Sequence, residues 1–498
     1  MSEGTVQVVA GMYGGWKKPS KAGLAGMSLG TTLGVLAGIG VVMLLFFTAG
    51  WLAALIAGTV LLGFVVGVAW VDQDGMTLAA RVGERLAWWQ AKSTGGGVYR
   101  SGPLAPSARG RCRLPGVAAH LELVEVKDAY GDPVGLVVSK AQRTAALVLS
   151  CQPGGTAMTD AAEVDQLVAY WGGWLAQLGE ETDIEAASVT IETAPDTGAR
   201  LGQQLRGRLD PDAPPAARQV LLDAIDTYPL GAAEVNGYVT LVFNMAPPGG
   251  KARPVDALAG DIMARLPGLA GSLASTGAGV VRALSAQDLC EVIRVAYDPS
   301  VAPLIDQAHA AGQVPDLSWE DVGPVAAEAT WDSYHHDSAW SRTWVMTQPQ
   351  KGMVRSNVLA RLLAPHAKID RKRVTLLYKP IEPGRAAQLV DADVEAATGH
   401  AINQTRPNAR AAVELKHAQR AADQQANGAG MVEFGMLVTA TVTDPEARRD
   451  AGVAVANLGA GTRVRLRPVY GSQDSAFAAA LPLGLVLSKY LVLPGRSR

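Results

Sequence analysis

The chain has 498 residues, with 44 Lys and Arg side chains against 46 Asp and Glu side chains. This length indicates about two to four folding units, and the near-neutral charge excludes a strongly cationic nucleic-acid-binding protein. Three widely separated cysteines, Cys112, Cys151 and Cys290, exclude the disulfide framework of a small secreted protein and indicate reduced thiols.

An uncharged stretch dominates the N-terminal part of the chain. No charged residue occurs between Ala22 and Val71. A transmembrane helix needs roughly 20 apolar residues, so residues 22–71 predict a hairpin of two spans, 25–47 and 52–70, with a turn at Gly50. The stretch is too long for a signal peptide. A pair of buried core helices is the alternative.

Positive side chains flank this stretch on both sides: Lys17, Lys18, Lys21, Arg81 and Arg85. Because positive flanks stay in the cytoplasm, we expect a multi-pass protein of the plasma membrane with both termini in the cytoplasm. Residues 1–21 would then form a cytoplasmic N-terminal tail. Trp51 and Trp70 would lie at opposite water–lipid boundaries.

Residues 72–97 predict an amphipathic juxtamembrane helix followed by a short linker. Leu78, Val82, Leu86 and Trp89 recur at the spacing of one helix face, with basic side chains between them. Such a helix fits the inner leaflet of a membrane and fits equally well a packing position on the following domain.

Residues 98–300 are expected to form a first α+β subdomain. The stretch 121–150 predicts three strands, of which the first two form a hairpin with a turn at 130–133. A helix begins at Asp160, with Glu163 three residues later. Further strands are expected at 188–193, 238–245 and 279–284, and Ser285 with Asp288 predicts the capped start of another helix.

Residues 301–498 are expected to form a second α+β subdomain. Strands are predicted at 328–334, 340–347, 374–379, 432–442 and 462–469. A long Ala-rich helical arm runs from about 385 to 426 and is interrupted at Pro407. Because hairpins and returning helices lack regular βαβ spacing, we expect antiparallel sheets with helices. The predicted fold class is therefore an α-helical transmembrane hairpin plus an α+β soluble region of two ferredoxin-like or related subdomains.

Sequence motifs for catalysis are missing. Gly249-Gly250-Lys251-Ala252 lacks the upstream glycine and the hydroxyl of a P-loop, so the chain is not itself a P-loop ATPase. His335, His336 and Asp337 are adjacent, and neighbouring side chains on a strand point to opposite faces. An ordinary polar strand end therefore explains them better than a metal site. We predict no catalytic, cofactor-binding or metal-ligating residue.

Four segments in chain order carry a resemblance to a known family. They are YGGWKKP (Tyr13, Gly14, Gly15, Trp16), VYRSGPL (98–104), TWDSYHHDSAW (Trp331, Tyr334, Asp337, Trp340) and FAAALPLG (Leu481, Pro482). Together they resemble an actinobacterial family of integral membrane proteins encoded beside conjugation and type IV secretion-like genes. The hairpin looks like the PrgI-like membrane subunit. The following region is similar to the N-terminal domain of a VirB-type secretion ATPase.

The resemblance implies a non-enzymatic, membrane-anchored structural component of a conjugative or type IV secretion-like transport apparatus. Because the sequence stops shortly after its FAAALPLG segment, the motor would be a separate cytoplasmic ATPase that this protein recruits. The implied partners are that ATPase, other apparatus subunits and the lipid bilayer, in an oligomeric complex with no cofactor and no direct nucleic-acid contact. An E-type membrane subunit of a type VII (ESX) secretion system is the alternative, since its architecture is similar. A membrane-tethered enzyme is a third hypothesis.

Overall fold

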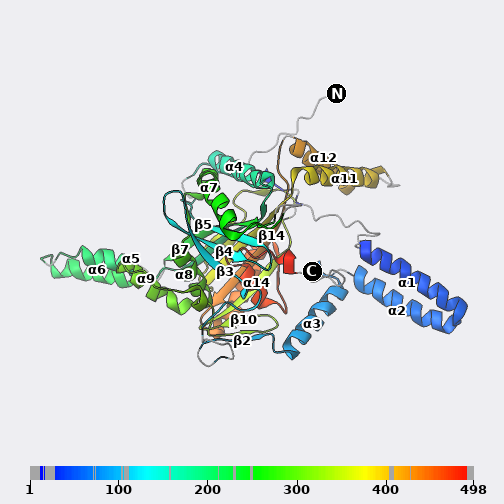
Figure 1. Ribbon diagram of the computed structural model, residues 1–498, viewed down its shortest axis with the longest axis horizontal. Helices are drawn as coiled ribbons and strands as arrows, with labels where there is room; N and C mark the ends of the chain where they lie inside the picture. Colours follow the sequence, from blue (N-terminus) through cyan, green and yellow to red (C-terminus); the bar gives the residue numbers. More distant parts are fainter. Residues whose placement is uncertain are drawn as a thin grey trace.

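A large antiparallel sheet forms the body of the protein, and pairs of helices project from it (Figure 1). The structure is a computed structural model. It describes residues 12–14, 16, 29–70, 72, 75–102, 105, 111–155, 159–210, 212–227, 232–246, 251–350, 352–402, 409–426 and 428–490.

Thirteen strands of the described residues belong to this sheet, and every ladder between them is antiparallel. They are β2 (Val98–Arg100), β3 (Glu122–Lys127), β4 (Pro133–Ser139), β5 (Thr144–Gln152), β6 (Ile184–Pro195), β7 (Ala233–Asn244), β8 (Val280–Ala283), β9 (Ala326–Ala329), β10 (Tyr334–His336), β11 (Ala339–Gln348), β13 (Arg371–Pro380), β14 (Val432–Val442) and β15 (Arg465–Pro468). The order is β2-β9-β10-β11-β14-β13-β6-β7-β5-β4-β3, while β8 pairs with β5 and β15 with β11. A separate two-stranded sheet joins β1 (Met12–Tyr13) to β12 (Val354–Arg355).

The α-helices of the described residues are α1 (Leu29–Thr48), α2 (Trp51–Ala69), α3 (Leu78–Ser93), α4 (Ala161–Glu180), α5 (Ala199–Gly207), α6 (Pro215–Thr227), α7 (Val255–Leu273), α8 (Ala286–Tyr297), α9 (Ala302–Ala310), α10 (Ala360–Leu363), α11 (Pro383–Ile402), α12 (Ala409–Ala426), α13 (Arg448–Gly461) and α14 (Gln473–Ala479). The capping box predicted at Ser285 and Asp288 is confirmed, because each side chain accepts a hydrogen bond from the other residue's backbone N–H. Asp160 stands at the N-cap of α4, but its side chain makes no capping hydrogen bond.

The sheet is built from two copies of one topology. In the first half, β5, α4, β6, β7, α7 and β8 follow each other in the chain, and the strands lie in the order β8-β5-β7-β6. In the second half, β11, α10, β13, β14, α13 and β15 give the order β15-β11-β14-β13. Both are the βαββαβ arrangement of ferredoxin-like folds.

The two halves join through their second strands. β6 and β13 pair antiparallel, with Glu192 opposite Arg373, so the sheet continues without a break from one half to the other. Each half carries a helical insertion at the same place, between its second and third strands. The pair α5–α6 follows β6, and the pair α11–α12 follows β13, and the two project in different directions in Figure 1. The α5–α6 pair was not predicted from the sequence, and Pro407 lies outside the described residues.

Both faces of the first half are covered, which explains its nearly continuous apolar strands. Leu147 and Leu149 of β5 face a core formed with α4 and α7. Ala146 and Val148 of the same strand face a second core, which includes α8 and Phe477 of α14. In the second half, α10 and α13 cover one face of β11, β13 and β14. The C-terminal end of α14, with Ala479 and the following Ala480, packs on the opposite face.

The predicted membrane spans are a misassignment. In the part of the chain that the structure describes, no helix is both long and apolar enough to cross a membrane. The predicted transmembrane hairpin and the multi-pass plasma-membrane location are therefore wrong, whereas the α+β region with its antiparallel sheet is found.

Candidate functional site

Helix α3 is held against the body by its polar side. The Arg467 guanidinium of β15 donates to both carboxylate oxygens of Glu84, at 2.6 and 3.1 Å. Trp88 packs edge-on against Trp331, with 5.3 Å between ring centroids. A two-point guanidinium–carboxylate pair fixes orientation as well as distance. These contacts therefore determine which side of α3 faces outward.

The outward side of α3 is apolar. Leu78, Val82, Leu86 and Trp89 are between 42% and 68% exposed. We call these four residues the α3 stripe. A helix usually turns such a stripe toward the core of its own protein. Here the core contacts are made by the polar side, so the stripe remains available to another molecule.

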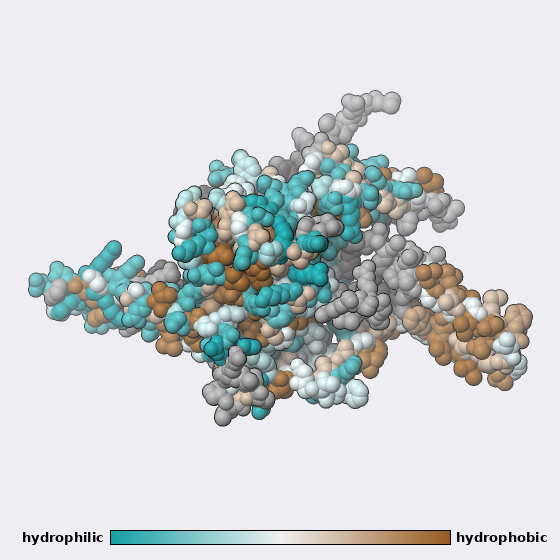
Figure 2. Space-filling view, in the orientation of Figure 1, coloured by the Kyte–Doolittle hydropathy of each residue, from teal (hydrophilic) through white to brown (hydrophobic). Residues whose placement is uncertain are grey.

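Helices α1 and α2 extend this apolar surface. They form a hairpin whose turn passes through Gly50, at a φ of 86° that favours glycine. The hairpin packs closely at Gly38, where a Cβ would lie 2.6 Å from Cδ1 of Leu61. Its exposed apolar side chains include Leu33, Leu36, Val41, Met43, Leu44, Phe46, Phe47, Trp51, Leu52, Leu55, Ile56, Val60, Leu62 and Phe64. Figure 2 shows them as a brown region at the right of the molecule.

The hairpin and α3 lie next to each other. Helix α2 packs against α3, and Arg81 of α3 forms an ion pair with Asp72 just beyond α2. We call the hairpin's exposed apolar residues together with the α3 stripe the apolar surface. Large exposed apolar patches mark sites of association. This surface is the main candidate functional site of the chain.

The predicted flanking residues have different surroundings. Trp51 and Trp70 are 65% and 63% exposed, within or beside the apolar surface. Arg85 is also exposed, on the same helix as the stripe. Lys17, Lys18 and Lys21 lie outside the described residues.

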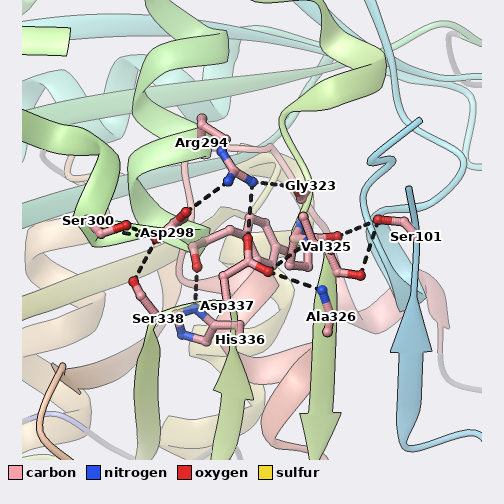
Figure 3. Close-up of polar contacts among 12 residues, drawn as sticks. Ser101, Arg294, Asp298, Ser300, Gly323, Val325, Ala326, His336, Asp337 and Ser338 are labelled. Carbon is pink, nitrogen blue, oxygen red and sulfur yellow. Dashed lines mark hydrogen bonds and ion pairs between the residues drawn. The ribbon is translucent and has the colours of Figure 1, made fainter. Parts of the chain in front are cut away.

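The central motif contains a polar network around Asp337 (Figure 3). Asp337 lies in the turn between β10 and β11 with a left-handed φ of 42°. Its carboxylate accepts hydrogen bonds from the backbone N–H of Val325 at 2.7 Å and of Ala326 at 3.1 Å. Arg294 of α8 donates to Asp337 at 3.2 Å and to Asp298 at 2.9 Å. The network therefore ties the motif to helix α8.

The pKa values of the two carboxyl groups in this network are shifted in opposite directions. Burial raises the pKa of Asp337 above its ordinary value, although Arg294 and backbone N–H groups oppose that shift. Burial also acts to raise the pKa of Asp298, but hydrogen bonds from Ser338 and Ser300 and the charge of Arg294 outweigh it and lower the pKa. Each carboxylate is occupied by partners from the chain itself, which indicates a role in holding the fold.

His336 is completely buried, and its hydrogen bonds are those of a neutral imidazole ring. Its Nδ1 lies 2.5 Å from the carbonyl oxygen of Tyr297, and its Nε2 lies 2.7 Å from the Ser341 hydroxyl. Because a carbonyl only accepts, Nδ1 carries the proton, and Nε2 accepts from Ser341. Burial lowers the pKa of His336 to about 4. His335 faces the other way and stacks on Trp340, so the expectation that the two histidines point to opposite faces is confirmed.

The remaining motif residues bring distant segments together. Trp331 stacks on Tyr470 with 5.4 Å between centroids, and the buried Tyr334 contacts Phe477 at 5.3 Å. Phe477, Leu481 and Pro482 are all buried. Ser101 of the 98–104 segment donates to the carbonyl of Pro324 at 2.7 Å. Three of the four motif segments therefore meet in one region, although residues 103 and 104 lie outside the described part.

The N-terminal motif lies elsewhere. Tyr13 pairs with Val354 in the small sheet, and its hydroxyl donates to Asp165 of α4 at 3.2 Å. Gly14 approaches the backbone of Gly352 so closely that a Cβ would be only 2.3 Å from its oxygen. Trp16 packs edge-on against Phe434 of β14, and Gly15 lies outside the described residues.

A buried ion cluster at the junction of the halves was missed by the sequence reasoning. Glu192 of β6 accepts from Arg373 and Arg371 of β13, at 2.8 Å each. The two arginines flank Lys372 on one strand, and such a run of basic residues in an apolar strand is a signal for buried counter-charges. Lys372 is 1% exposed, and burial lowers its pKa to about 8.

Metal and thiol chemistry has little support among the described residues. Within those ranges, no group of three His, Cys, Asp or Glu side chains is placed to hold a metal ion. Burial raises the pKa of Cys151 to about 11 and that of Cys290 to about 12. Thiols of this kind stay protonated and act as small core residues.

No protein-family model and no curated protein matches the chain.

Proposed function

We propose that this chain is a non-enzymatic structural component of a conjugative or type IV secretion-like transport apparatus that binds a separate ATPase. The observation that carries the proposal is the apolar surface, which other subunits would cover. The resemblance of the four motif segments supplies the type of apparatus.

The orientation of α3 supports a docking role for that surface. Rotation of the helix by half a turn would turn Leu78, Val82 and Leu86 toward the body, a direction that the hydrophobic effect favours. The Glu84–Arg467 pair and the Trp88–Trp331 contact hold the opposite orientation instead. A side that is kept exposed against this driving force is explained by a partner that buries it.

The polar clusters support a structural role for the body. Asp337, His336 and Glu192 each have hydrogen-bond partners from the chain on their polar atoms. Such groups join strands and helices of the chain to one another. The meeting of three motif segments around Phe477 is consistent with motifs that specify a fold.

The test is affinity capture of the tagged full-length chain from its native cells, with partners identified by mass. Val82→Asp and Leu86→Asp place charges on the α3 stripe, and Val314→Asp is the matched control because Val314 is 70% exposed outside that surface. We expect a VirB-type ATPase and apparatus subunits with the wild-type chain and the control, and loss of subunits with the stripe variants.

Three results would contradict the proposal. An FtsK-like ATPase with small WxG-type substrates would move the assignment to a type VII system. Flotation of the purified chain with phospholipid vesicles, without protein partners and lost in the stripe variants, would assign the apolar surface to lipid. Capture of partners that include no secretion ATPase would contradict the assignment of the chain to a secretion apparatus.

A further inference from the structure

A cavity of about 360 Å³ lies between strands β11 and β14 and the first turn of α13. Its lining includes the guanidinium-bearing residues Arg342, Arg448 and Arg449 together with Trp340 and Trp344. This volume lies within the range of roughly 300–1,000 Å³ that is usual for ligand sites. We call it the Trp340 pocket.

Both faces of the Trp340 ring are occupied. His335 stacks on it with 4.0 Å between centroids and 16° between planes, and Cζ of Arg448 lies 4.1 Å from the same centroid. Two groups this close to one ring centre cannot share a face, so they lie on opposite sides. The ring therefore orients Arg448 and has no face left for an aromatic ligand.

The arginines keep donors available. Nε of Arg448 donates to the carbonyl of Pro445 at 2.7 Å, which leaves its two terminal nitrogens. Arg342 lies over Trp344 and has one long ion pair with Asp332, at 3.4 Å, while its buried Nε has no hydrogen-bond partner among the described residues.

The charge balance of the pocket matches a singly charged anion. The lining holds three guanidinium groups and two carboxylates, those of Asp332 and Glu446, so one positive charge is in excess. Asp450, in the same turn of α13, is already paired with Lys368 at 2.8 Å. The N-terminal end of α13 adds partial positive charge.

We propose that the Trp340 pocket binds a carboxylate side chain of an acidic peptide segment from a protein partner. Planar guanidinium groups match the geometry of carboxylates, which they bind through paired N–H donors. A nucleotide fits less well, because Trp340 offers no face for a base and the single excess charge does not balance a phosphate. The proposal concerns a different surface from the α3 stripe and stands whether or not the chain belongs to a secretion apparatus.

The experiment is isothermal titration of the purified full-length chain with N-acetyl-tetraglutamate amide. Tetraglutamine peptide and inorganic phosphate serve as comparison ligands. We expect tetraglutamate to bind, with an affinity that falls as salt is added, and Arg448→Gln and Arg449→Gln each to weaken it about tenfold. Arg385→Gln, an exposed arginine on α11, is the matched control and should leave the affinity unchanged.

Several results of this titration would overturn the proposal. Equal binding of tetraglutamine, or equal loss with Arg385→Gln, would overturn the proposal, as would the absence of binding at millimolar peptide. Tighter binding of phosphate, lost in the same variants, would reassign the pocket to phosphate. If Arg448→Gln fails to fold by circular dichroism, Arg449→Gln decides the matter, because Arg449 is exposed at the helix start.

Discussion

Glu192 and Arg373 form a buried ion pair across the junction of the two halves of the sheet. Nη2 of Arg373 lies 2.6 Å from Oε2 of Glu192, and the two residues stand directly opposite each other in the β6–β13 ladder. Burial acts to raise the pKa of Glu192, but the charges of Arg373 and Arg371 outweigh it and hold the pKa below its ordinary value. The first half of the chain is therefore joined electrostatically to the second.

Replacing Glu192 with Gln should destabilise the protein strongly, because it leaves the Arg373 charge buried without its partner. We expect a loss of about 3–5 kcal/mol in the free energy of unfolding, measured by urea denaturation. The matched control is Glu122→Gln, whose partner Lys140 is exposed, and it should cost less than about 1 kcal/mol. Equal effects of the two variants would contradict this. The contribution of Glu192 should be present above its unfolded pKa and be lost as pH falls through its lower folded pKa.

His336 should make the protein less stable in mild acid. Its folded pKa of about 4 lies below the ordinary value of 6.5, so the unfolded chain binds the proton first. Its contribution is complete above pH 6.5 and declines as pH falls toward 4, by about 3 kcal/mol. Urea denaturation at pH 7, 6 and 5 should show a smaller pH dependence in His336→Gln than in the wild type. His417→Gln, on α12, is the control, and an unchanged slope in His336→Gln would refute the prediction.

Gly484 should not tolerate a side chain. It has a φ of 67°, and a Cβ there would lie 2.3 Å from Cβ of Ala146. Gly484→Ala combines an unfavourable backbone conformation with overpacking, for a total cost of about 2–5 kcal/mol. Gly428→Ala has the same kind of φ, 87°, but open space around it, so it should cost only about 1–2 kcal/mol. Thermal denaturation of both variants checks the difference, and similar melting temperatures would argue against close packing of the C-terminal segment.

Glu84→Gln should loosen α3 without unfolding the body. Arg467 is 7% exposed in its side chain and loses its charged partner in this variant. We expect faster amide hydrogen exchange in residues 78–93 and unchanged protection in β13 and β14. Arg85→Gln, one residue further along the same helix and exposed, is the control. Faster exchange in both variants, or in neither, would mean that the Glu84–Arg467 pair does not orient the helix.

Local signals in the sequence predicted local structure well. Ser285 and Asp288 are three residues apart, and their hydrogen bonds involve only their own backbone, so the cap forms wherever the helix forms. Neighbouring side chains on a strand alternate between faces, so His335 and His336 were separable in advance.

Pairing between distant segments could not be predicted from local patterns. Glu192 and Arg373 are 181 residues apart, and neither local sequence identifies the other residue as its partner. The insertion α5–α6 lies between two strands that a simple hairpin turn could connect. Its position is explained only when the two halves are compared, because α11–α12 is inserted at the equivalent place in the second half.

The sequence by itself determined most of the strands, the cap at Ser285 and Asp288, and the apolar character of residues 22–71, because these depend on neighbouring residues and on the period of the chain. Only the tertiary structure decided what each apolar face packs against. The uncharged N-terminal stretch was assigned to membrane spans because apolarity alone does not say what covers it. The side of α3 that faces outward was decided by Arg467, nearly four hundred residues away, through a contact that no local pattern encodes.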